Sequence, residues 1–66
     1  MVKTVKATYD SASTVDNVVV DLLGTGIPRD NIFIDKANNL VEVNIPAETE
    51  PEASEILKRH NPVKFD

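Results

Sequence analysis

The chain has 66 residues, of which 41% are hydrophobic and 27% charged, and its formal net charge is −4. This length predicts one domain over residues 1–66 with a single small core, and the acidic surplus disfavours nucleic acids and anionic membrane surfaces as partners. The absence of cysteine excludes disulfides and thiolate metal sites.

The first predicted element is a strand over residues 2–9. Val5, Ala7 and Tyr9 alternate along it with polar residues such as Lys6. Period-two alternation that is rich in valine and threonine is typical of a strand with one buried face. We therefore expect the three apolar side chains to point into the core.

A helix is predicted to follow, beginning near Ser13. Ser13 and Asp16 have the spacing of a capping box with a shorter acid at its third position. Apolar residues then recur at the spacing of one helix face, at Val15, Val18, Val19, Leu22 and Leu23. The consecutive valines at 18–20 favour a strand instead, but the match to one helix face outweighs their weak propensity. Gly24 and Gly26 are expected to end the helix.

The middle of the chain predicts a hairpin of two strands, residues 31–35 and 40–45, joined by an asparagine-containing turn at 36–39. The residues of the later strand that are expected to face the core are Val41, Val43 and Ile45. The facing of the earlier strand is open, because its apolar residues are consecutive. Placing its two isoleucines inward, which we prefer by count, leaves Phe33 outward.

A second helix is predicted in the last third of the chain. Thr49 and Glu52 form a capping box, and Pro51 lies in the first turn, where its missing N–H costs little. The buried stripe of this helix is expected to be Ala53, Ile56 and Leu57. The helix is expected to end at residues 61–62, an Asn-Pro pair, and residues 63–65 are long enough for a short final strand.

These elements occur in the order strand–helix–strand–strand–helix–strand. Two right-handed crossovers with antiparallel pairing predict an α+β fold, a ferredoxin-like βαββαβ two-layer sandwich. Its sheet order would be 4-1-3-2, with the second and fourth strands at the edges, and both helices would cover one face. The other face would be open to solvent or to a partner. Because this fold hosts many unrelated functions, it predicts none by itself.

A candidate protein interface lies on the open face of the predicted sheet. Its residues are Lys6, Phe33, Leu40 and Glu42. Phe33 and Leu40 are apolar side chains that we expect on this solvent-facing surface, although scattered exposed apolar residues are normal in proteins. RNA binding through this face is disfavoured, because the outward positions of the first and third strands hold no aromatic residue on which bases would stack.

A candidate ligand-binding edge is formed by the loops that precede the two helices. Its residues are Asp10, Ser11, Ser13, Glu48 and Thr49. Two helix N-termini brought together favour an anion, but the acidic residues work against one. A hard cation held by Asp10 and Glu48 is an alternative. Calcium needs about six to eight oxygen ligands, so solvated caps and turns are the simpler interpretation.

His60 is the single histidine of the chain, and no orienting partner for general-base chemistry lies near it in the sequence. It falls at the C-terminal end of the second predicted helix, where we expect it to pack or to complement the helix dipole. The serines are explained by capping and surface positions. The sequence therefore predicts no catalytic residue, no metal site and no cofactor.

Segments in both halves of the chain resemble the small α/β domain of bacterial general-stress proteins. In the second half these are residues 43–48 and the helical segment 53–61, and in the first half Tyr9-Asp10, the apolar stripe of the first predicted helix and residues 26–32. The resemblance covers nearly the whole chain through packing and turn signals. It implies a bacterial protein of uncharacterised role that is linked to stress, and it supplies no catalytic residues.

We predict a non-catalytic binding or assembly module. The N-terminus lacks the apolar segment of a signal peptide and no apolar run approaches a membrane span, so we expect a cytoplasmic location. The partner would be a second copy or another protein, bound through the open sheet face or an edge strand. The alternative is a regulatory domain that senses a small ligand at the candidate ligand-binding edge. A small enzyme with a site between subunits is a third interpretation.

Overall fold

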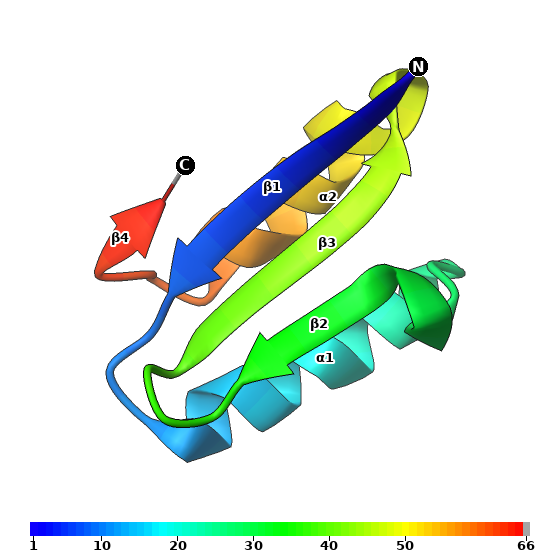
Figure 1. Ribbon diagram of the computed structural model, residues 1–66. Coiled ribbons are helices and arrows are strands. Elements are labelled where there is room, and N and C mark those ends of the chain that lie inside the picture. The colour runs from blue at the N-terminus through cyan, green and yellow to red at the C-terminus, as the bar shows by residue number, and fades with distance from the viewer. Residues whose placement is uncertain (66) are drawn as a thin grey trace.

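The computed structural model describes residues 1–65 and shows a small α+β domain (Figure 1). The strands are β1 (Val2–Thr8), β2 (Ile32–Asp35), β3 (Leu40–Pro46) and β4 (Lys64–Phe65). The helices are α1 (Ala12–Thr25) and α2 (Glu50–Arg59), and the 3-10 turns are η1 (Arg29–Asn31) and η2 (Ala47–Thr49). The predicted succession of strands and helices is confirmed.

Within the described residues the sheet has four strands in the order β2-β3-β1-β4, which is the predicted order 4-1-3-2 read from the other edge. Each pair of neighbouring strands is antiparallel. Figure 1 shows α1 and α2 on the same side of the sheet, behind the strands. One face is therefore packed against helices, and the other is open in the part of the chain that the structure describes.

The core lies between the sheet and the two helices. Alternate residues of β1 and β3 point into it, and the register places Val5 opposite Val43 and Ala7 opposite Val41. The buried residues of the helices are Val15, Val18, Val19, Leu22, Ala53, Ser54, Ile56 and Leu57. Both predicted stripes are thus confirmed, except that Leu23 is only half-buried at the border of the α1 stripe.

The N-cap of α1 is Ser11, not Ser13 as the spacing predicted. Ser11 has extended backbone (φ −150°, ψ 154°), and its hydroxyl accepts a hydrogen bond from the Thr14 N–H at 3.2 Å. Ser13 already lies in the first turn, where its backbone is helical. At the other end Gly26 has φ 105°, a conformation that favours glycine, and its N–H bonds to the last carbonyls of the helix.

We expect replacement of Ser11 by alanine to lower the free energy of unfolding by about 1 kcal/mol, because the Thr14 N–H loses its acceptor. The matched Ser13→Ala variant should change it by less than about 0.5 kcal/mol. Urea unfolding of the two variants measures the difference. Equal losses would show that Ser13 shares the capping role.

The predicted capping box of α2 is wrong. Thr49 ends η2 with helical backbone angles (φ −90°, ψ −11°), and its side chain makes no capping hydrogen bond within residues 1–65. An N-cap side chain reaches the helix from extended backbone, which this residue does not have. The first turn is held instead by Ser54, whose hydroxyl donates to Glu50 Oε2 at 2.6 Å. Pro51 lies in the first turn, as predicted.

The facing of β2 is settled by its register against β3. Phe33 lies opposite Glu42 and is 49% exposed, while Ile34 lies opposite the buried Val41. Phe33 therefore points to the open face and the two isoleucines point to the helix side, as preferred. Ile34 is nevertheless 40% exposed, because β2 is an edge strand. The strand begins one residue later than predicted, since Asn31 belongs to η1.

The last strand, β4, is shorter than predicted. Phe65 pairs with Ala7 and packs against the core, and the Lys58 ammonium lies 4.8 Å from the centre of its ring. Val63 precedes the strand, but its N–H already donates to the Thr8 carbonyl at 2.8 Å. The pairing of β1 with β4 therefore involves only the C-terminal end of β1 within the described residues.

Candidate functional site

The four residues of the candidate interface all lie on the open sheet face. Lys6 of β1 is opposite Glu42 of β3, which is opposite Phe33 of β2, so these three form one row across the sheet. Leu40 belongs to the next row, opposite Thr8. The structure thus brings together the residues that the alternation predicted to share a face.

This row combines a charged pair with an aromatic edge. Lys6 Nζ lies 3.9 Å from Glu42 Oε1, and both side chains are partly exposed, so the pair contributes little to stability. Phe33 stands at the outer end of the row with half of its surface in solvent. The neighbouring row toward the start of β1 is polar, because the Thr4 hydroxyl donates a hydrogen bond to Asn44 Oδ1 at 2.7 Å. The apolar contact area therefore lies toward β2.

The candidate ligand-binding edge is not formed. Because β1 and β3 are antiparallel, Thr8 at the end of β1 lies opposite Leu40 at the start of β3, and Val2 lies opposite Pro46. The loop with Asp10 and the turn with Glu48 therefore lie at opposite ends of these strands, as Figure 1 also shows. The strands are about 20 Å long, so no small ligand bridges the two segments.

The side chains of the two separated segments have local roles. Ser11 caps α1, and its Oγ lies 3.3 Å from Ser13 Oγ and 2.9 Å from Thr14 Oγ1. Thr49 closes η2 before α2 begins. The helix N-termini are likewise apart, so they do not combine into an anion site. The interpretation of these residues as caps and turns is the one that fits the structure.

His60 makes a contact that sequence reasoning missed. Its Nε2 lies 2.6 Å from Asp21 Oδ2, which joins the C-terminal end of α2 to the side of α1. The two residues are 39 positions apart, so no local pattern signals the pair. The sequence predicts only a packing or dipole role for His60. The contact makes it a link between the helices.

Tyr9 is the polar group most deeply placed in the core. Its hydroxyl donates to the Leu57 carbonyl at 2.7 Å, which fixes the end of β1 to α2. Burial raises the pKa of Tyr9 to about 12, because the phenolate would lose its hydration. The side chain is therefore neutral at ordinary pH, and it serves as a structural hydrogen-bond donor.

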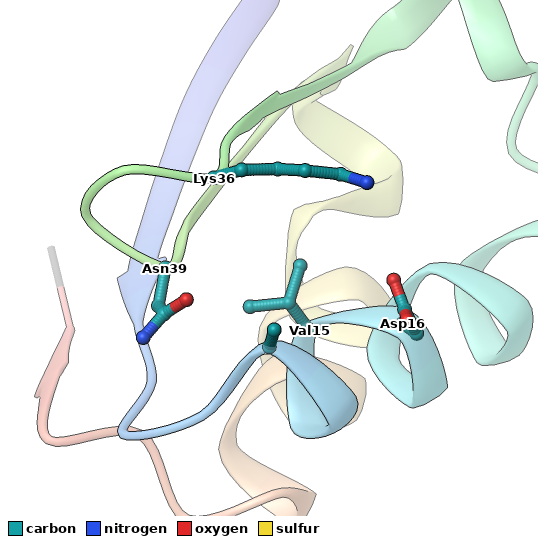
Figure 2. A pocket seen from close by; sticks show the side chains of 5 residues that line it. Val15, Asp16, Lys36 and Asn39 are labelled. Atoms are coloured by element: carbon teal, nitrogen blue, oxygen red, sulfur yellow. The ribbon is translucent and has the colours of Figure 1, made fainter.

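A shallow hollow lies where the β2–β3 turn meets the start of α1. Figure 2 shows Lys36 extending from the turn above Val15, with Asp16 and Asn39 at its rim. The space inside is about 40 Å³, whereas small-molecule sites usually measure about 300 Å³ or more. This hollow has room for little more than water.

The helices and the comparisons add two further findings. Within residues 1–65, neither helix is long and apolar enough to cross a membrane. Comparison of the chain with protein-family models, with curated proteins and with solved structures found no match.

Proposed function

We propose that the protein is a non-catalytic binding or assembly module whose contact surface is the open sheet face near β2. The observation that carries the proposal is Phe33, an aromatic side chain that is 49% exposed beside the Lys6–Glu42 pair. An aromatic anchor with charged groups at its border is typical of protein contact surfaces. Leu40 extends the apolar part of the same face.

The shape of the molecule supports a surface contact rather than an enclosed ligand. The hollow beside α1 is too small for a substrate of ordinary size. A nucleic acid is disfavoured by the net charge of −4 and by Glu42, an acid in the middle of the face. The partner that fits these observations is another protein.

Three further proposals accompany this one. The sheet order and the placement of both helices on one face support a ferredoxin-like sandwich. A bacterial origin and a role linked to stress are supported by the resemblance of residues 26–32, 43–48 and 53–61 to bacterial general-stress-protein domains. We also propose a cytoplasmic location.

A capture experiment with matched variants tests the proposed function. Immobilised protein and its Phe33→Asp variant are exposed to the same bacterial lysate, and the retained proteins are compared by mass spectrometry. We expect a defined set to be retained by the original protein and lost with Phe33→Asp, because a charge in the apolar part of the surface opposes its desolvation.

The control is Val63→Asp, which alters a residue that is 65% exposed outside the open face near β2. It should retain the same set as the original protein. Circular dichroism of all three proteins ensures that the fold is intact. If Phe33→Asp retains the full set, the open face near β2 is not the contact surface.

A further inference from the structure

The edge strand β2 exposes apolar side chains on both of its faces. Phe33 is 49% exposed on the open side, and Ile34 is 40% exposed on the helix side. A partner that covers only the open face would leave Ile34 in water. A partner that lies along the edge of the strand covers both residues.

Most of the outward backbone groups of this edge are also unpaired. The Tyr9 N–H donates to the Asn39 carbonyl, and the Ala47 N–H donates to the Met1 carbonyl. These two bonds flank the β1–β3 ladder, so within it the odd-numbered residues of β1 direct their N–H and C=O groups toward β3. The even-numbered residues of β3 must then bond to β2, which uses the polar groups of Phe33. The C=O group of Ile32 and the N–H and C=O groups of Ile34 therefore point outward, and within residues 1–65 no strand pairs with them. The Ile32 N–H donates to the Arg29 carbonyl at the end of η1.

We propose that two copies of the chain join along their β2 edges in an antiparallel, two-fold symmetric pair, with Phe33 opposite Phe33 of the second copy. This inference rests on the proposed function and names its partner. In this register Ile32 of one copy lies opposite Ile34 of the other, so all the opposed pairs formed by residues 32–34 are apolar. Aromatic and β-branched cross-strand pairs stabilise sheets, and the outward backbone groups gain partners.

Charge at the ends of the strand favours the same arrangement. Asp30 lies just before β2 and Lys36 just after it. Antiparallel pairing brings the start of one strand to the end of the other, so each acid approaches a lysine of the second copy. A register centred on Ile34 instead would oppose Phe33 and Asp35, which loses the aromatic pair. The edge at β1 is less suited, since it carries Lys6 and is partly covered by β4.

Single cysteines test this register directly, because the natural chain has none. In the proposed pair F33C lies at the two-fold axis, within reach of a disulfide to its symmetry mate. The matched control is E42C, which lies in the same row of the same face. Its two copies would be separated by three strand spacings, about 14 Å, which is too far for a disulfide. We expect covalent dimers of F33C under mild oxidation, and none of E42C.

Sedimentation equilibrium of the cysteine-free protein provides a second readout. We expect the mass of two chains, conversion to one chain by Ile34→Lys, and no conversion by Val63→Lys. Ile34 is on the helix side, so this variant leaves the open face unchanged. Equal crosslinking of F33C and E42C, a dimer that survives Ile34→Lys, or a single chain at millimolar concentration would each overturn the inference. A single chain that still captures partners through Phe33 would leave the proposed function standing.

Discussion

Replacement of Leu22 by alanine is expected to unfold a large fraction of the protein at room temperature. Leu22 is fully buried between α1, the sheet and α2. Removal of a buried leucine side chain typically costs about 2–5 kcal/mol, because contacts are lost and a cavity remains. A domain of this length has a total stability of only about 3–5 kcal/mol. The variant therefore loses most of its free energy of unfolding.

Urea unfolding followed by circular dichroism measures this effect, and the neighbouring leucine supplies a control. Leu23→Ala makes the same chemical change at a half-buried position. We expect it to cost less than half as much, since solvent already covers part of the side chain. Similar losses for both variants would contradict the assignment of Leu22 to the centre of the core.

The second large effect concerns Tyr9 at alkaline pH. Burial raises its pKa to about 12 in the folded protein, whereas an unfolded tyrosine titrates near 10. Between these values the unfolded chain loses the phenolic proton while the folded protein keeps it. The unfolded state is then favoured, so this contribution to stability is complete below pH ~10 and is lost as the pH rises toward 12. The loss should reach roughly 2–3 kcal/mol.

The Tyr9→Phe variant isolates this contribution from the titration of lysines. At neutral pH it should be less stable by about 1 kcal/mol, because the Leu57 carbonyl loses its donor. Phenylalanine has no proton to lose, so the variant should decline less above pH ~10 and become the more stable protein near pH 12. Stability curves that stay parallel from neutral to alkaline pH would show that Tyr9 is not held in the neutral form.

The elements of the fold were predictable because their signals are periodic. The alternation in β1 and β3 reflects which face of each strand is buried, and the spacing from Val15 to Leu22 reflects which face of the helix is buried. Each pattern is visible within a short stretch of sequence. The facing of β2 was harder to predict, since Ile32, Phe33 and Ile34 are consecutive apolar residues. An edge strand leaves both of its faces partly exposed, which blurs the pattern.

The helix starts were predicted less well for a local reason. Ser11, Ser13 and Thr49 all have the residue types of an N-cap, and the backbone angle decides which of them acts as one. Sequence spacing does not report that angle. The 3-10 turn before α2 gives Thr49 helical backbone angles, so Thr49 does not cap the helix. The backbone before α1 is extended at Ser11, so Ser11 is the N-cap.

The separation of the two loops of the candidate ligand-binding edge already follows from the predicted strand order. A sheet of order 4-1-3-2 with antiparallel neighbours already makes the first and third strands run in opposite directions. The loops that follow them, with Asp10 and Glu48, must then lie at opposite ends.

The contact of His60 with Asp21 is different in kind, because it depends on how two helices cross. Neither helix contains a sequence pattern that predicts it.

The position of β1 has a consequence for the order in which the chain folds. Its residues pair with β3, and the whole of α1 and β2 lies between the two strands in the sequence. The β2–β3 hairpin closes through a four-residue turn, whereas the β1–β3 ladder must first close a much longer loop. During synthesis β1 therefore leaves the ribosome long before its main partner exists. Lys3 and Lys6 place charge on β1, which opposes its association with strands of other chains while β3 is absent.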